Sequence, residues 1–151
     1  MSALLEFKHV QFAYHGASPV LRDASMALRS GEKIGLVGDM GTGKTTFLHL
    51  AVGLLKPQAG EVSVFGAARR TERDFDEVRR RVGLVFQHSD DQLFCPTVLE
   101  DVAFGPLNLG LPVTAAKHAA ASAACQALMT LLRMPSTTFC STSGTCLYAA
   151  A

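Results

Sequence analysis

The chain reads Gly38-Asp39-Met40-Gly41-Thr42-Gly43-Lys44-Thr45, which fits the phosphate-binding pattern G-x-x-x-x-G-K-[ST]. Apolar residues within 34–37 lead into this stretch, and residues 46–52 lead out of it as a helix. A strand, a glycine loop and a helix in this order bring backbone amides and a helix N-terminus toward one anion. The stretch therefore predicts a site that holds nucleotide phosphates.

Each residue type in this loop has a physical role. The three glycines lack a Cβ, so the backbone can take positive φ and come close to phosphate oxygens. Lys44 supplies a positive charge for the outer phosphates, the Thr45 hydroxyl suits a Mg²⁺ ligand position, and Thr46 suits a further phosphate contact. The alternative, a glycine-rich turn with a chance lysine, is disfavoured by the flanking strand and helix.

Length and charge exclude several classes of protein. With 151 residues and a formal net charge of +1, the chain predicts one domain and gives no electrostatic reason to expect nucleic acid. The N-terminus has no basic leader followed by a long apolar stretch, and no window reaches the roughly 18 apolar residues of a membrane span. We therefore expect a cytosolic chain unless a partner docks it to a membrane. The cysteines lack Cys-x-x-Cys spacing and predict reduced thiols: Cys95, Cys125, Cys140 and Cys146.

The hydrophobic pattern predicts alternating β and α elements after a β-rich start. Alternation over 5–14 slips by one residue, which indicates a strand with a bulge or bend. Further strands are expected over 20–28, 33–37, 61–65 and a buried one over 82–86. Helices are expected from 44 or 45 to near 55, from a capping box at Asp74 to 81, from 98 to about 105, and from 114 to about 132. The arginines within 69–81 predict a solvated basic face.

Other motifs surround the loop in a recognisable order. Tyr14 precedes a Pro19-Val20-Leu21-Arg22-Asp23 segment, Gln87 ends the strand expected over 82–86, and residues 85–108 contain VFQHSDDQLF and EDVAFGPLN. Together with the loop, they resemble the ATP-binding cassette (ABC) transporter ATPases, in the energy-coupling-factor and cobalt or nickel importer branch. The resemblance covers about residues 4–133.

The resemblance implies an α/β fold: a P-loop NTPase core with an N-terminal antiparallel β subdomain and the start of a helical subdomain from about residue 88, incomplete in this chain. It implies ATP and Mg²⁺ as cofactors, with Tyr14 stacking on adenine, Lys44 and Gln87 as catalytic residues, and Thr45 and Gln87 at Mg²⁺. It also implies a peripheral place on the cytoplasmic side of the cell membrane, contact of Asp90 to Phe94 with a membrane-embedded subunit, and a second ATPase subunit bound head-to-tail. The nucleotide-binding set is then Tyr14, Gly38, Asp39, Met40, Gly41, Thr42, Gly43, Lys44, Thr45 and Thr46.

The chain departs from the family pattern in two places. Met40 stands where the family commonly has asparagine, and so offers no amide side chain. No Asp or Glu follows Asp101, so the acidic pair that holds Mg²⁺ and polarises water in such ATPases is missing, as are the signature motif and a switch histidine. Residues 134–151 carry no charge. We interpret them as an unrelated tail from an interrupted reading frame, and expect core sheet edges left without partners.

Three functions stay open at this point. The first is the energy subunit of an importer for a transition-metal ion or a vitamin, driven by ATP binding and hydrolysis. The second is a nucleotide-binding remnant that does not hydrolyse ATP, which the missing acidic pair favours. The third, a P-loop kinase or GTPase, is disfavoured by the joint placement of Tyr14, Gln87 and the 90–108 stretch. ATP and GTP are not distinguished.

Overall fold

The computed structural model describes residues 3–86, 93–131, 137–141 and 146–149, with side chains described in 3–86 and 93–123. It divides into two compact units. One holds residues 1–87 and 136–151, and the other holds residues 88–135. No helix within the described ranges is long and apolar enough to cross a membrane.

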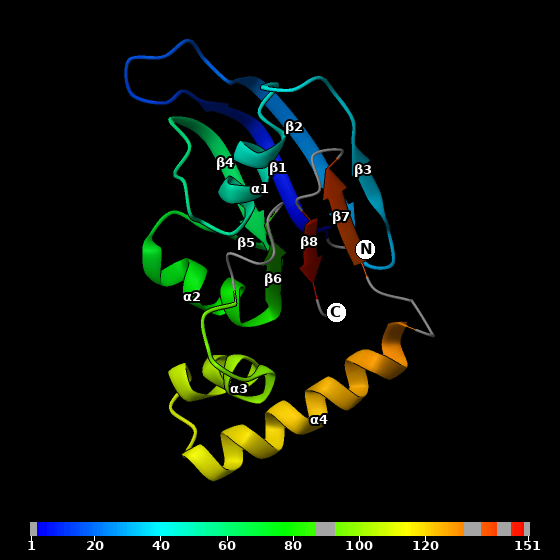
Figure 1. Ribbon diagram of the computed structural model, residues 1–151. Helices are drawn as coiled ribbons and strands as arrows, with labels where there is room; N and C mark the ends of the chain where they lie inside the picture. Colours follow the sequence, from blue (N-terminus) through cyan, green and yellow to red (C-terminus); the bar gives the residue numbers. More distant parts are fainter. Residues whose placement is uncertain (1–2, 87–92, 132–136, 142–145, 150–151) are drawn as a thin grey trace. The chain divides into compact units, whose positions relative to one another are not determined.

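The elements alternate between strands and helices, as the sequence predicts (Figure 1). The strands are β1 Ala3–Phe12, β2 Leu21–Arg29, β3 Ile34–Leu36, β4 Ala59–Val64, β5 Ala67–Ala68, β6 Val82–Val85, β7 Thr137–Ser141 and β8 Cys146–Ala149. The helices are α1 Lys44–Ala51, α2 Glu72–Arg81, α3 Val98–Asn108 and α4 Val113–Leu131.

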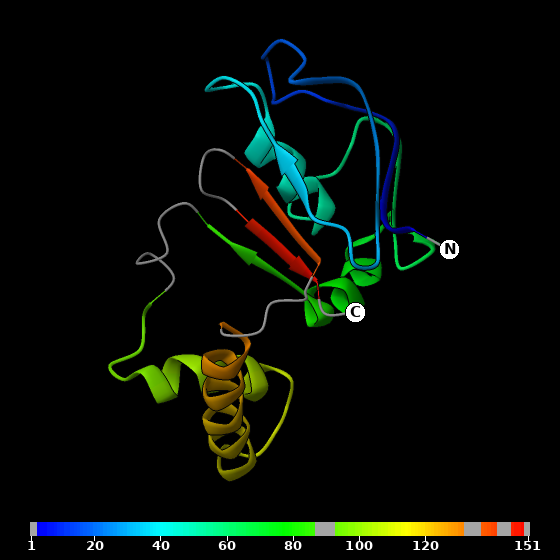
Figure 2. The ribbon, with the colours of Figure 1, turned by 90° about the vertical axis from the view of Figure 1, so that its right-hand side faces the viewer.

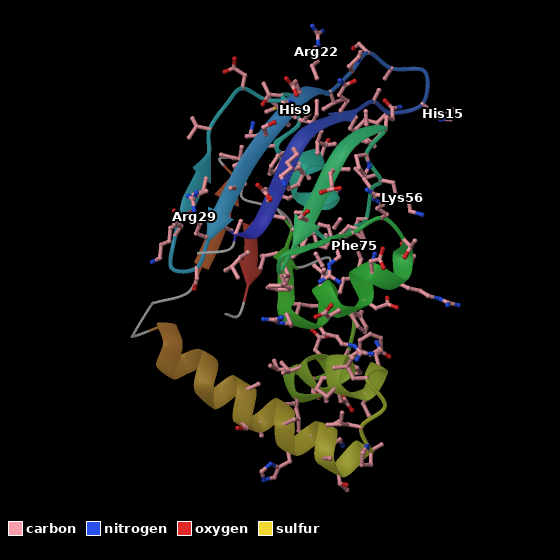
Figure 3. The ribbon with its side chains drawn as sticks, turned by 180° about the vertical axis from the view of Figure 1, so that it is seen from behind. His9, His15, Arg22, Arg29, Lys56 and Phe75 are labelled. Carbon is pink, nitrogen blue, oxygen red and sulfur yellow. The ribbon has the colours of Figure 1, made fainter. Side chains whose placement is uncertain are left out.

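The first sheet is antiparallel and has the order β2-β1-β4-β5. The pairing of β1 shifts between Phe7 and Val10, where His9 has φ 51° and its amide donates to Ser25 Oγ at 2.9 Å (Figure 3). The bend predicted from the slip in alternation is confirmed. A Cβ on Gly60 would lie 2.4 Å from the His9 carbonyl oxygen, so β4 approaches this bend closely only because residue 60 is glycine.

Helix α1 packs against this sheet and forms the main core with it. The rings of Phe7 on β1 and Phe47 on α1 stack with centroids 4.0 Å apart. Leu48 and Leu50 are fully buried on the same helix. Burying side chains of this size contributes about 1.5–3 kcal/mol each, so this face of α1 anchors the helix whose other end carries the glycine loop.

Helix α1 ends at Ala51, four residues before the predicted end near residue 55. Gly53 has φ 71°, its amide donates to Leu50 O at 3.2 Å, and the Leu54 amide donates to His49 O at 2.9 Å. These bonds form a Schellman end, which a glycine in the left-handed region provides. The prediction relied on Pro57 and overlooked this nearer signal.

The other helix boundaries differ by smaller amounts. Asp74 is the third residue of α2 and accepts from the Thr71 amide at 2.7 Å, so Thr71 rather than Asp74 is the N-cap. Helix α3 begins as predicted after Thr97, whose hydroxyl accepts from the Glu100 amide at 3.3 Å. It continues past Pro106 to Asn108, because a proline in the last turn removes a single helical donor.

The arginines within 69–81 form the predicted solvated face except at Arg69. The Arg69 side chain is 9% exposed, and its guanidinium donates to Val64 O at 3.0 and 3.2 Å and to Asp74 O at 3.1 Å. Arg81 lies over the Phe65 ring, 3.8 Å from its centroid. A planar guanidinium can satisfy several carbonyls at once, so these side chains join α2 to the neighbouring strands.

A second sheet in the same unit has the order β3-β7-β8-β6 (Figure 2). β7 pairs in parallel with β3, and β8 pairs antiparallel with β6. β3 and β6 thus each gain one partner, contrary to the expectation that they stay unpaired, although both still lie at the edges of this sheet. Segments rich in threonine, cysteine and aromatic residues favour the extended state, and backbone groups at an edge accept any such segment.

Strand β6 is only partly buried, contrary to the prediction. Val82 is buried, whereas Val85 and Phe86 are 46% and 37% exposed. The Phe86 ring meets the His49 ring of α1 edge-on at 5.9 Å. The strand thus has a buried start and an exposed end.

The second unit consists of helices α3 and α4, which contact each other through small residues. Ala103, Ala116 and Ala120 form its buried cluster. Phe94, in the segment before α3, meets Phe104 edge-on with centroids 4.7 Å apart. Small side chains let the two helix backbones approach closely, but they bury little apolar area.

Candidate nucleotide site

The loop after β3 ends at the N-terminus of α1. Gly43 is the N-cap with φ 89°, and the first helical hydrogen bond runs from the Phe47 amide to Gly43 O at 2.8 Å. The amides of residues 44–46 therefore point out of the helix end. No side chain caps this end, and its first turn has no acidic residue. An uncapped N-terminus without negative charge attracts an anion.

Two of the three loop glycines adopt the conformation that the sequence predicts. Gly41 and Gly43 have φ 83° and 89°. A Cβ on Gly43 would lie 2.6 Å from Val20 Cγ1. Both this close contact and the positive φ therefore exclude a side chain at residue 43. Gly38 does not have positive φ, contrary to prediction, and a Cβ there would lie 3.0 Å from Thr42 Oγ1. The constraint on Gly38 is therefore contact with Thr42.

The Lys44 ammonium lies inside the loop. It donates to Gly38 O at 2.8 Å and Asp39 O at 2.5 Å, and Thr42 Oγ1 is 3.4 Å away. The Thr42 hydroxyl donates to Asp39 O at 2.9 Å. Lys44 is 9% exposed. An ammonium has three donors, so in this state the loop carbonyls satisfy the charge that a phosphate would meet.

A pocket of about 320 Å³ opens above the helix N-terminus. It is lined by Tyr14, Val20, Met40, Gly41, Gly43, Lys44, Thr45 and Thr46. The volume lies at the lower end of the range for small-molecule sites. Positive charge and free amides lie at one side, and a tyrosine ring and two apolar side chains complete the wall.

Tyr14 joins the pocket from the connection between β1 and β2. Its ring meets Phe12 edge-on at 4.9 Å, and its hydroxyl lies 3.0 Å from Thr46 Oγ1. The side chain is 45% exposed. The ring thus lies partly exposed at the pocket wall, where a flat ligand could reach it.

The structure brings most predicted nucleotide contacts together. Seven of the ten predicted nucleotide-binding residues line the pocket, whereas Gly38, Asp39 and Thr42 lie beneath it around the Lys44 ammonium. Gln87 lies outside the described residues. Met40 is fully exposed at the pocket rim.

Sequence reasoning missed Val20. Its amide donates to Phe12 O at 2.8 Å, which closes the connection between β1 and β2 and brings Val20 against Gly43. The contact itself follows from the connection between the two strands, which the sequence does not show. Its proximity to Tyr14 in the sequence was the available signal.

The donor set fits Mg²⁺ only together with a nucleotide. Thr45, at the second position of α1, supplies a hydroxyl at the pocket wall. Within the described residues, no cluster of three His, Cys, Asp or Glu could hold a metal by itself. Mg²⁺ commonly binds through one or two protein oxygens and substrate phosphates, so Thr45 would hold an ion that arrives with the phosphates and neutralises part of their charge.

A strand, a glycine loop with a buried lysine and an open helix N-terminus define a P-loop nucleotide-binding protein. The ABC transporter family matches residues 21–145, and the chain belongs to this family. The match includes part of the uncharged tail. The origin of that tail in another reading frame stays a prediction.

Relatives support the same assignment. The energy-coupling factor transporter ATP-binding protein EcfA of Methanothermobacter thermautotrophicus is 49% identical over 113 residues, covering 72% of this chain and 35% of that protein. The cobalt import ATP-binding protein CbiO of Rhodobacter capsulatus is 46% identical over 112 residues, covering 74% of this chain and 40% of that protein. The resemblance inferred from the sequence motifs is confirmed.

A solved structure supports the fold. That of cbiO1 from Clostridium perfringens, part of the ABC transporter complex cbiONQ, aligns with a TM-score of 0.67 and 28% identity over 78% of this chain and 47% of that one. The predicted α/β fold class is confirmed. The chain spans less than half the length of these relatives.

Proposed function

We propose that this chain is the nucleotide-binding part of the energy subunit of an importer, in which ATP binding and hydrolysis drive uptake of a transition-metal ion or a vitamin. The observation that carries the proposal is the uncapped N-terminus of α1 beside the buried Lys44 and the pocket. The names of the relatives, which include cobalt import and energy-coupling factor ATP-binding proteins, support the class of cargo.

In this proposal the amides of residues 44–46 and the Lys44 ammonium bind phosphate oxygens, and Tyr14 stacks on the base. Lys44 exchanges its bonds to Gly38 O and Asp39 O for phosphate oxygens. A charged acceptor forms a stronger bond than a carbonyl, so this exchange favours the bound state. Thr45 holds Mg²⁺ with the phosphates, and Gln87 acts beside it.

Isothermal titration calorimetry with Mg·ATP tests the binding step. The wild-type chain should bind Mg·ATP saturably. Lys44→Ala should lose more than about 1.5 kcal/mol of binding free energy, or roughly tenfold in affinity, because hydrogen bonds to charged groups are worth about 1.5–3 kcal/mol. Lys33→Ala is the matched control, because it removes the same charge from an exposed residue away from the pocket. Equal affinity in all three proteins would refute the proposal.

A second candidate function is nucleotide binding without hydrolysis. It differs from the first in lacking the acidic pair that such ATPases use on Mg²⁺ and water, and residues 102–151 contain no Asp or Glu. Phosphate release at saturating Mg·ATP separates the two candidates. A rate above the Lys44→Ala background supports the ATPase, and a rate equal to it supports the remnant.

We further propose that residues 90–94 contact a membrane-embedded subunit on its cytoplasmic side, while a second ATPase subunit binds head-to-tail across the nucleotide. Residues 90–92 lie outside the described part of the chain. Leu93 and Phe94 are 67% and 63% exposed, which suits an apolar contact.

Photocrosslinking in cells tests the membrane contact. A benzophenone amino acid at position 94 should crosslink to a protein with membrane spans, identified by mass spectrometry. The same group at Leu54, which is 51% exposed in the other unit, is the control. Equal capture from both positions, or none from position 94, would contradict the contact.

A further inference from the structure

We propose that Thr46 is a positioning residue that holds the Tyr14 ring at the pocket wall and thereby couples base recognition to the phosphate-binding helix. This inference rests on the proposed nucleotide binding. The Tyr14 hydroxyl lies 3.0 Å from Thr46 Oγ1, although the residues are 32 positions apart. Both side chains line the pocket.

Within the described residues, the Tyr14 ring also has an aromatic neighbour. Tyr14 follows the end of β1 in a connection, and Phe12, the last residue of β1, meets its ring edge-on. Nearly half of the side chain is exposed. Phe12 contacts the aromatic ring, whereas Thr46, 6% exposed on the anchored helix α1, contacts the hydroxyl. The hydroxyl pair therefore ties the far end of the ring to a rigid element.

Hydroxyl chemistry makes this link sensitive to the ligand. A hydroxyl donates one hydrogen bond and accepts two, and a phosphate oxygen only accepts. When the Thr46 hydroxyl donates its hydrogen bond to an anion at the helix N-terminus, its oxygen can still accept a hydrogen bond from the Tyr14 hydroxyl. The bonds then run in one direction, from Tyr14 to Thr46 to phosphate. Chains of this kind strengthen one another in a low-dielectric pocket.

The expected consequence concerns the base more than the phosphates. A ring held in place before binding loses less freedom when a base stacks on it. Removing the link should therefore weaken ATP more than inorganic tripolyphosphate, which carries the phosphates without a base. We define the base ratio as the tripolyphosphate Kd divided by the ATP Kd.

Calorimetry with both ligands on the full chain measures this ratio in wild type, Tyr14→Phe, Thr46→Val and the double variant. Each single change removes the hydrogen bond and should lower the base ratio about fivefold, the equivalent of one ordinary hydrogen bond. The double variant should show no further fall, because both changes remove the same interaction. Thr46→Ser keeps the hydroxyl and should restore the ratio.

Several outcomes would overturn the inference. An unchanged base ratio in Tyr14→Phe would do so, and this variant keeps the test sharp because it removes one oxygen from a half-exposed ring. If Thr46→Val weakened the binding of both ligands equally, Thr46 would be a phosphate contact and not a positioning residue. Additive effects in the double variant would make the residues independent. If the wild-type chain bound tripolyphosphate as tightly as ATP, it would show no base recognition. If it bound neither ligand, the proposed function itself would be refuted.

Discussion

Replacing Gly53 with alanine should strongly destabilise the unit that carries the nucleotide site. Gly53 ends helix α1 with φ 71°, and a Cβ there would lie 2.2 Å from Phe75 Cγ (Phe75 is labelled in Figure 3). The left-handed conformation costs a side-chain-bearing residue about 1–2 kcal/mol. Forcing a methyl group into a packed ring adds about 1–3 kcal/mol. The sum is about 2–5 kcal/mol.

Gly66 supplies a matched control, because it has φ 77° and a Cβ there would have no atom within 4 Å. Gly66→Ala should carry only the conformational part, about 1–2 kcal/mol. Urea unfolding followed by far-ultraviolet circular dichroism gives both values, provided that the slope of free energy against urea is unchanged. If Gly53→Ala is no more destabilising than Gly66→Ala, the close packing of α2 on the end of α1 is wrong.

Two further changes test the same region. Arg79 donates to Val52 O at 3.1 Å and to Gly53 O at 3.0 Å. Arg79→Ala should therefore lower the free energy of unfolding by about 1.5–3 kcal/mol. Arg80 is exposed, and Arg80→Ala should change this free energy by less than about 0.5 kcal/mol in the same urea assay. Burial lowers the pKa of His49 below its ordinary 6.5. The unfolded chain therefore binds the proton more tightly than the folded chain does. The contribution of neutral His49 to the free energy of unfolding is fully present above pH 6.5 and is lost as the pH drops from 6.5 toward the folded pKa. Urea midpoints at pH 7.5 and 5.5 should differ less in His49→Phe than in wild type, and an equal difference would exclude His49 as a source of the loss.

Local signals predicted the parts of the fold that depend on neighbouring residues. The glycine loop lies between β3 and α1, and the slip in alternation marks the bend at His9. Thr97 caps α3 through Glu100, as the spacing of these residues indicates. In each case a short pattern contains the whole physical cause, so tertiary contacts do not override it.

Contacts that the residue pattern does not reveal explain the failures. The Arg69 side chain is largely covered because it meets the carbonyls of Val64 and Asp74, and no charge pattern along the sequence reveals that. Val20 reaches the pocket only through strand pairing. The link between Tyr14 and Thr46 joins residues whose separate roles were predicted, but their contact depends on how α1 packs on β1.

The most direct test of nucleotide binding at the loop is a titration of ¹⁵N-labelled chain with Mg·ATP, followed by amide chemical shifts. Saturable shifts are expected at residues 41–46, Tyr14 and Val20, and tripolyphosphate should produce the same shifts in the loop. In Lys44→Ala these shifts should need much higher ligand concentrations. Saturable shifts confined to another surface, or none at 41–46, would contradict nucleotide binding at the loop.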